Sequence, residues 1–277
     1  MRKNSQLRYW LNKIMNTDSK VKKHLISRKI DRFFIKIYKT SSFTVRYFKE
    51  SVTSPHEVGE FVQQCYNIGY KSLSLITLTG FITGYVFTKQ SRPSLAEFGA
   101  TSWIPSLVGI AMIRALAPLV TALICAGKVG SSIGAEIGSM KVTEQIDAME
   151  VSAVNPYKYL VVTRVTASTL MVPILMMYTG FVGLLGSFLN VATSEQTSLA
   201  TFFHNAFERI TMLDITSSLI RSLAYGFTIG IVGCYKGYHT TQGTQGVGKA
   251  ANAAVVASMF LIFIEEVIIV QIVNWFR

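Results

Sequence analysis

Charged residues are scarce in this chain of 277 residues. They make up 15% of it, against about 25% in an ordinary soluble domain, while hydrophobic residues make up 50%. Residues suited to disulfides or metal sites are few as well. The three cysteines are widely spaced, and none of the four histidines lies four residues from another, as two ligands on one helix face would. The composition therefore predicts lipid as the main solvent and favours neither a disulfide framework nor a metalloenzyme.

The chain also lacks the residue sets that an enzyme or an ATPase would need. No Ser-His or His-Glu set occurs at the spacing expected of a membrane-embedded lipid enzyme. Residues 243–249, GTQGVGK, match the phosphate-loop pattern, but Ala250 follows where Ser or Thr would bind magnesium, and an apolar helix precedes where a β-strand is needed. We therefore expect no ATP, magnesium or other cofactor in this chain, and any nucleotide site belongs to another polypeptide.

The net charge of +12 is concentrated at the N-terminus. Residues 1–50 hold fourteen Lys and Arg against three acids, and the rest of the chain is close to neutral. A basic arm ahead of an apolar chain is typical of cytoplasmic retention and of contact with anionic lipid, so no nucleic-acid partner is expected. Basic residues recur there at helical spacing among apolar ones, which predicts an interfacial amphipathic helix; a solvated basic tail is the alternative. The basic residues are Arg32, Lys36, Lys39, Arg46 and Lys49.

Five stretches are apolar enough to cross a bilayer, which takes about 20 residues each. They lie near 66–88, 103–127, 160–190, 213–235 and 251–275. Backbone groups in lipid must bond internally, so the crossings are predicted to be helices, with Pro173 a possible break in the third. The fold class is thus an all-α integral membrane protein, with a basic arm at 1–58 and a membrane domain at 59–277. The N-terminus is expected in the cytoplasm, together with the segments 128–159 and 236–250.

Small residues suggest where helices approach each other closely. Gly80 and Gly84 lie four residues apart in the first crossing, and Gly130, Gly134 and Gly138 repeat at the same interval after the second. The acids at 144, 147 and 150 follow the second set at helical spacing. This segment either docks on a partner or is an ordinary amphipathic connector.

The same segment resembles the characteristic region of the MlaE/YrbE permeases. The matching residues are AGKVG at 126–130, AEIGSM at 135–140, TEQIDAMEV at 143–151 and NP at 155–156. The resemblance extends through Arg114 and Pro118, LDITSSLIRS at 213–222, and GVGKA and AVVASM within 246–259. It covers roughly residues 60–275.

The resemblance implies the permease subunit of an ABC-type lipid transporter, non-catalytic and homodimeric. Two cytoplasmic ATPase subunits would bind ATP and magnesium, and an MCE-domain protein would exchange glycerophospholipid with the permease. The location implied is the bacterial inner membrane, with the plastid inner envelope as an alternative. Sterol or fatty-acid import of the YrbE kind is an alternative function, and a lipid enzyme or a structural scaffold are hypotheses from other classes.

The resemblance also assigns residues to roles. A coupling helix between the second and third crossings would meet the ATPase through Glu136, Thr143, Glu144, Gln145, Asp147 and Glu150. Lipid would bind at the dimer centre near Phe87, Leu95, Phe98 and Leu107.

Intramembrane charges are expected at Arg114, Arg221 and Glu265. The sequence departs from relatives at Ala115, where some have an acid, and at the pair Glu265 and Glu266, where many have one Asp. We expect these two acids to pair with Arg114 or Arg221, and Glu265 aligns better than Glu266 with the acid of relatives.

Overall fold

The computed structural model describes residues 34–35, 37–53, 57–195, 197–241 and 243–275. The chain divides into two compact units, Met1–Lys49 and Glu50–Arg277. Every regular element in the described ranges is helical, as the composition predicts. The expectations for residues 1–33 and for Lys36 lie outside the described residues.

The described part of the basic arm is a helix over residues 34–35 and 37–52. Lys39, Arg46 and Lys49 are exposed on it. Large apolar side chains are exposed as well, among them Tyr38 and Phe48. The predicted helix is therefore confirmed over these residues, and its location at a membrane surface stays a prediction.

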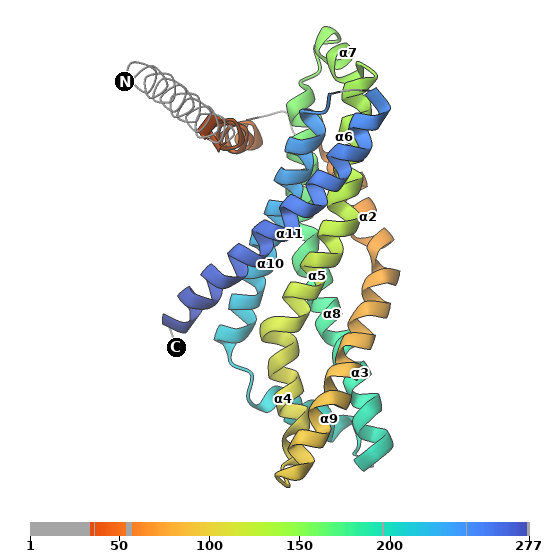
Figure 1. Cartoon of the computed structure of the whole chain (residues 1–277), viewed down its shortest axis with the longest axis vertical. Helices are drawn as coiled ribbons and strands as arrows, with labels where there is room; N and C mark the ends of the chain where they lie inside the picture. Colours follow the sequence, from red (N-terminus) through yellow and green to blue (C-terminus); the bar gives the residue numbers. More distant parts are fainter. Residues whose placement is uncertain (1–33, 36, 54–56, 196, 242, 276–277) are drawn as a thin grey trace, which may run out of the picture. The chain divides into compact units, whose positions relative to one another are not determined.

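Ten α-helices follow in the second unit (Figure 1). They are α2 (Val58–Ile68), α3 (Leu73–Glu97), α4 (Ile104–Ala111), α5 (Ala117–Cys125), α6 (Ser131–Val142), α7 (Gln145–Val151), α8 (Thr163–Glu195), α9 (Leu199–Glu208), α10 (Met212–Tyr238) and α11 (Gly243–Trp275). Short 3-10 turns occupy Tyr70–Ser72 and Thr101–Trp103, and π-helical turns occupy Met112–Leu116, Ala126–Gly130 and Tyr157–Val162. Residues 243–249 form the first turns of α11, directly after α10, and thus do not have the strand-then-loop context of a phosphate site.

Among the described residues, four helical segments are long and apolar enough to cross a membrane: Thr101–Val142, Tyr157–Thr193, Met212–Tyr238 and Gly243–Trp275. They correspond to the last four predicted crossings. The first predicted crossing coincides with α3, whose 25 residues span about 37 Å at 1.5 Å each. Its composition is less apolar because it is rich in threonine, although hydroxyls such as that of Thr83 bond to the carbonyl four residues back. A fifth crossing stays a prediction.

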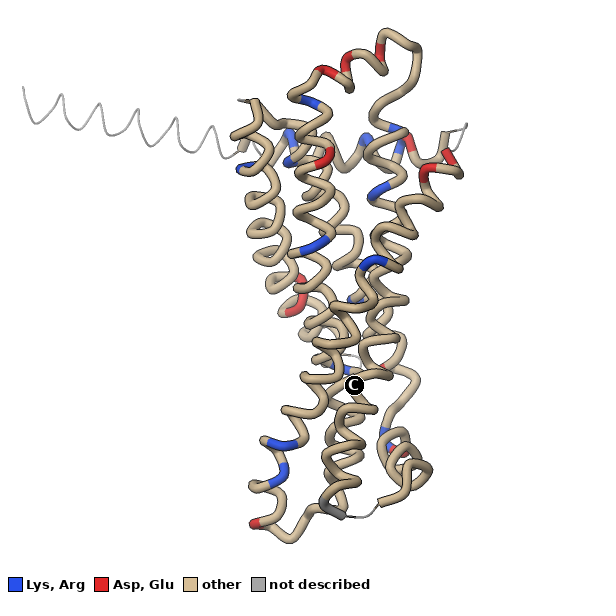
Figure 2. The backbone as a smooth tube through the Cα atoms, turned by 90° about the vertical axis from the view of Figure 1, so that its right-hand side faces the viewer, with Lys and Arg blue, Asp and Glu red and all other residues tan. Residues whose placement is uncertain are grey.

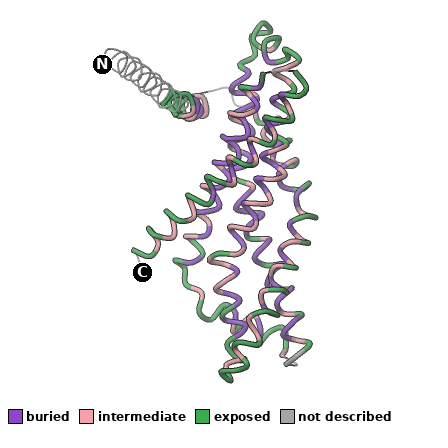
Figure 3. The backbone as a smooth tube through the Cα atoms, in the orientation of Figure 1, coloured by how far each residue is buried: buried purple, intermediate pink, exposed green. Residues whose placement is uncertain are grey.

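Helices α8 and α10 form the centre of the second unit. In the most apolar 18 residues of each of these two crossings, 61% of the residues are buried, compared with 17% for α11. Figure 3 shows that α11 is largely exposed toward its C-terminal end. Helix α8 packs against α3 on one side and against α10 on another, and α10 packs against α11. The large exposed side chains of α11, such as Phe260 and Val267, therefore need lipid or another protein subunit to cover them.

The second crossing is longer than predicted. Its helix runs without interruption for 42 residues, through two π-turns, and ends at Val142 instead of near residue 127. At 1.5 Å per residue this is about 63 Å, roughly twice the hydrocarbon thickness. Helix α6 is thus a rigid extension beyond the apolar part, and α6 and α7 lie at the opposite end of the unit from α4 and α9 (Figure 1).

The glycines of α6 contact helices of the same chain. A Cβ built on Gly134 would lie 3.2 Å from Ala254 Cβ of α11, and one on Gly138 would lie 2.9 Å from Thr240 Oγ1, just after α10. The predicted close approach is confirmed, and it packs α6 onto its own bundle. The segment left to meet a partner is therefore shorter than the predicted 128–159.

Helices α3 and α8 approach at small residues. A Cβ on Gly84 would lie 1.9 Å from the carbonyl oxygen of Gly183, and one on Gly80 would lie 3.1 Å from Thr179 Cγ2. Pro173 lies within α8, which continues through it, so the possible break is not seen. Packing against α3 and α10 on either side holds α8 together despite the lost backbone hydrogen bond.

We predict that Gly84→Ala lowers the free energy of unfolding in mixed micelles by about 1–3 kcal/mol, because the new methyl group meets backbone that cannot move aside. Gly59→Ala in α2 is the matched control, since a Cβ there has nothing within 4 Å. Alanine favours a helix over glycine by about 1 kcal/mol, so the control should be neutral or stabilising. Equal stability of both variants would contradict the close approach.

Candidate functional site

One face of α10 carries a line of buried polar residues through the middle of the bundle. Asp214, Ser218, Arg221, Tyr225 and Thr228 are spaced four, three, four and three residues apart, so they share a helix face. Each is at most 6% exposed. We call these five residues the α10 polar stripe. Polar groups at such depth are costly unless they are paired, which makes the stripe the strongest candidate for a functional site.

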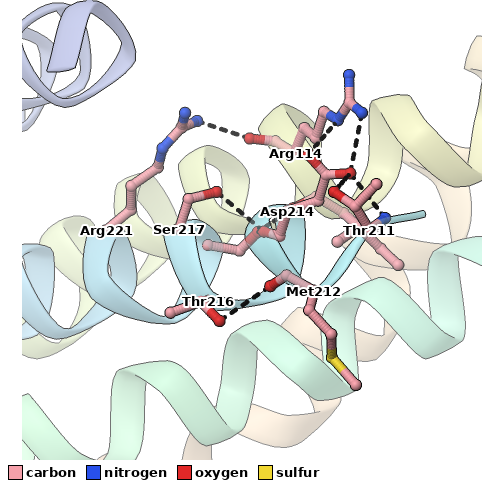
Figure 4. Close-up of polar contacts among 9 residues, drawn as sticks. Arg114, Thr211, Met212, Asp214, Thr216, Ser217 and Arg221 are labelled. Carbon is pink, nitrogen blue, oxygen red and sulfur yellow. Dashed lines mark hydrogen bonds and ion pairs between the residues drawn. The ribbon is translucent and has the colours of Figure 1, made fainter. Parts of the chain in front are cut away.

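At one end of the stripe, Asp214 binds Arg114 of the second crossing (Figure 4). Arg114 Nη2 donates to Asp214 Oδ2 at 2.9 Å, and Arg114 Nε lies 2.7 Å from Oδ1 without the geometry of a hydrogen bond, so the two side chains form an ion pair with one hydrogen bond. Asp214 also accepts hydrogen bonds from the backbone N–H and the hydroxyl of Thr211, and so forms the N-terminal capping box of α10. The Asp214 carboxylate thus caps the N-terminus of α10 and binds Arg114 of the second crossing.

Arg114 lies within the π-turn Met112–Leu116, where the N–H of Ala117 bonds to the carbonyl five residues back. A π-turn displaces carbonyls from their usual partners. Two of these carbonyls accept hydrogen bonds from the α10 polar stripe: Ser218 Oγ donates to Ile113 O at 2.7 Å, and Arg221 Nη1 donates to Arg114 O at 2.6 Å. The irregular turn is therefore held by side chains of α10.

The other half of the stripe faces the two acids of α11. Arg221 Nη1 lies 3.1 Å from Glu266 Oε1, and the hydroxyl of Tyr225 donates to Glu266 Oε2. Glu265 instead accepts a hydrogen bond from Thr228, and its Oε2 is buried without a hydrogen-bond partner among the described residues. The expectation that an acid pairs with Arg221 is met by Glu266, whereas Arg114 is taken by Asp214. Glu265, the acid favoured from the sequence, forms no ion pair in the described part of the chain.

Another buried charged residue, Arg164, lies at the N-terminal end of α8. It is 2% exposed, and its Nη2 donates to Glu136 Oε1 of α6 at 2.8 Å and lies 3.8 Å from Glu60 Oε1 of α2. Gln64 donates to Glu60 Oε1 at 2.7 Å, and the hydroxyl of Tyr159 donates to Oε2 at 3.2 Å. Glu136, predicted to meet the ATPase, therefore joins α6 to α8 within the chain.

The remaining coupling candidates lie around α7. Glu144 has a left-handed backbone with φ 58° and forms the turn before α7, so the acids do not lie on one helix as predicted. Asp147 pairs with Lys141 at 2.8 Å, while Glu150 is exposed. Figure 2 shows many Lys, Arg, Asp and Glu positions at the end of the second unit that carries α6 and α7. Thr143 and Gln145 are also exposed, and a neighbouring apolar residue, Val151, is 90% exposed.

The four predicted lipid-binding residues lie in different surroundings. Phe87 and Leu95 pack against a core cluster that includes Ile104 and Phe202, while Phe98 is 83% exposed. Leu107 is 40% exposed. Their role stays a prediction.

An apolar hollow of about 200 Å³ lies elsewhere, where the second crossing meets α8, α9 and α10. We define it by six of its lining residues: Ile113, Met176, Phe181, Leu184, Phe207 and Ser218. Ser218 belongs to the α10 polar stripe, so apolar space and polar groups adjoin there. The hollow is smaller than the roughly 300–1,000 Å³ of complete small-molecule sites.

Sequence reasoning missed Asp214 and Arg164. The signal for Asp214 was its spacing of four and seven residues from Ser218 and Arg221. The signal for Arg164 was a charge inside a predicted crossing at 160–190, which demands a partner.

We predict a coupling energy of about 0.5–3 kcal/mol between Arg114 and Asp214, as for residues joined in one ion pair. Removing either partner alone should cost less than the roughly 3–5 kcal/mol of a fully buried pair, because the Arg114 side chain is 28% exposed. The double-mutant cycle uses Arg114→Gln and Asp214→Asn and measures unfolding in mixed micelles. Asp214→Ala should cost more than Asp214→Asn, since alanine also removes the helix cap. Thr216→Ala is the control, because this exposed hydroxyl only bonds to Met212 O of its own helix. Additive single effects would contradict the pairing.

Comparison with known proteins identifies the family to which this chain belongs. The family model described as permease MlaE matches residues 61–272. A probable ABC transporter permease protein of Rickettsia prowazekii is 32% identical over 249 residues, covering 90% of this chain and 96% of that protein. Another of Synechocystis sp. is 40% identical, covering 74% and 78%. The chloroplastic protein TRIGALACTOSYLDIACYLGLYCEROL 1 of Arabidopsis thaliana is 34% identical, covering 75% of this chain and 59% of that protein. The chain therefore belongs to the MlaE permease family and is a non-catalytic, membrane-spanning subunit of an ABC-type transporter.

Proposed function

We propose that this permease moves glycerophospholipid between a membrane leaflet and an MCE-domain partner, driven by a separate ATPase. The observation that carries the proposal is the contact between the apolar hollow and the α10 polar stripe at Ser218. A cargo with an acyl chain and a polar head needs both surfaces side by side. The name of the Arabidopsis relative contains that of a glycerolipid, which supports the same class of cargo. Sterol or fatty acid of the YrbE kind is the alternative cargo, since either also fits an apolar hollow.

The exposed end of α7 supports the ATPase part of the proposal. An ABC permease needs a surface that receives motion from a nucleotide-binding partner, and Val151 together with the acids Glu144 and Glu150 is exposed beyond the apolar helices. Helix α6 connects this end to the second crossing without a break, so displacement of α7 reaches the π-turn that carries Arg114. In this scheme the two ATPase subunits bind ATP and magnesium.

The surface of α11 supports a homodimer. Its apolar residues are mostly exposed, and a second copy of the chain is one way to cover them. The proposal places the complex in a bacterial inner membrane with the N-terminus in the cytoplasm, because the basic residues are concentrated in residues 1–50. Two predicted crossings separate α7 from this segment, so the proposal places α7 on the same side. The plastid inner envelope is the alternative location.

A photoreactive amino acid at position 176 should capture glycerophospholipid in membranes, since Met176 lines the apolar hollow and is 5% exposed. The matched control is position 175, because Leu175 is equally buried but does not line the hollow. Mass spectrometry of the adduct identifies the cargo. Adducts of sterol or free fatty acid would support the alternative, and adducts formed only from positions 98 and 107 would move the site to the residues predicted from the sequence.

Ala148→Pro should abolish co-purification of the ATPase while membrane insertion persists. The substitution removes the hydrogen bond from Ala148 N–H to Glu144 O, and proline inside a helix costs about 3 kcal/mol or more. Ala148→Ser keeps the backbone bond and is the control, because Ala148 is exposed. Glu150→Lys should weaken the complex only modestly, since an exposed ion pair contributes about 0–1 kcal/mol. Normal assembly of the proline variant would rule out α7 as the contact.

A further inference from the structure

A recess of about 270 Å³ lies where α2 and the turn before α3 meet α6 and the π-turn Ala126–Gly130. Its polar lining includes Asn67, Lys71, Ser72, Lys128 and Ser132. We call it the lysine recess. It is separate from the apolar hollow and shares no lining residue with it.

The recess contains polar atoms without partners. Ser72 is 1% exposed, and its hydroxyl has no hydrogen-bond partner among the described residues. The side-chain oxygen of Asn67 is likewise buried and unpartnered. Buried polar atoms of this kind are rare because each costs about 1–3 kcal/mol when left unsatisfied. The Ser72 hydroxyl can donate to an oxygen of a ligand in the recess, whereas the Asn67 oxygen is an acceptor and needs an O–H or N–H of that ligand.

The charge of the recess is positive. Lys71 and Lys128 both line it, and the ammonium of Lys128 donates to the backbone carbonyl of Lys71 while retaining two further N–H donors. The acid in the lining is Glu136, whose carboxylate is bound by Arg164 at 2.8 Å. Glu60, behind Gln64, lies 3.8 Å from the same guanidinium. Lys71, Lys128 and Arg164 thus supply three cations in and beside the recess against the two acids Glu136 and Glu60, which leaves a net positive charge for an anion.

Both lysines of the recess lie close to the end of an apolar helical segment. Lys71 directly precedes the apolar residues of α3, and Lys128 directly follows the apolar α5. Contact between the two residues shows that both apolar segments end at one level. Lysines at the ends of apolar crossings lie at the depth of lipid phosphates.

We propose that the lysine recess binds a phosphate group, carried by an anionic lipid headgroup or by a small soluble phosphate ester. The ammonium groups of Lys71 and Lys128 neutralise it, and the Ser72 hydroxyl donates to a phosphate oxygen. Because Lys71 and Ser72 belong to the turn before α3 and Lys128 to the π-turn before α6, an occupied site would hold these two turns together beside the helix that leads to α7. The proposal does not depend on the identity of the transported cargo.

The test uses the full-length chain in detergent micelles without ATPase or MCE protein, and native mass spectrometry measures bound lipid. Phosphatidic acid and diacylglycerol with the same acyl chains are the probes, because they differ only by the phosphate. Phosphatidic acid should bind at least tenfold more tightly. Lys71→Gln and Lys128→Gln should each weaken its binding about tenfold, since each removes a hydrogen bond from a charged donor.

Lys89→Gln is the matched control, because Lys89 is an exposed lysine of α3 outside the recess. Ser72→Ala should weaken the binding of phosphatidic acid severalfold without changing the charge of the recess, and Lys128→Arg should retain this binding. The proposal can therefore be tested even if one glutamine variant does not fold. Competition by glycerol 3-phosphate at equal affinity would identify a soluble ester, and its failure a lipid headgroup. Equal binding of phosphatidic acid by the parent, Lys71→Gln, Lys128→Gln and Ser72→Ala would overturn the site, whatever the outcome of lipid transfer.

Discussion

The structure depends on one constraint, that polar groups inside an apolar bundle must find partners within the protein. The α10 polar stripe meets this constraint in two directions. Toward the second crossing, Asp214 binds Arg114, and Ser218 and Arg221 bind carbonyls of the π-turn. Toward α11, Arg221 and Tyr225 bind Glu266. Because partners are unavailable from lipid, these contacts set the rotation and depth of three helices at once.

Close backbone contact fixes the other side of the bundle. Glycines bring α3 to α8 and α6 to α10 and α11 with almost no space for side chains. Such contacts resist deformation, since interiors are packed densely and adopt discrete arrangements. The exposed apolar face of α11 and the apolar hollow are among the apolar surfaces that these contacts leave accessible.

The long second crossing joins the two ends of the molecule. Its α6 part carries α7, and its π-turn carries Arg114 in the core. Arg164 ties α6 to α8 and α2 at the end near α7. In the proposed function, a force on α7 passes through the turn at Glu144 to a continuous helix that is bound at several levels.

The sequence alone determined that the chain is helical and membrane-embedded, because a long apolar run satisfies its backbone only as a helix. It also located the segment that carries α7 and the close approach at Gly84. Only the tertiary structure decided that Arg114 pairs with Asp214, that Glu266 rather than Glu265 meets Arg221, and that Glu136 binds Arg164. These pairs join residues 28 to 100 positions apart. Their contact depends on how each helix is rotated and how deep it lies, and side-chain periodicity within one helix does not specify either.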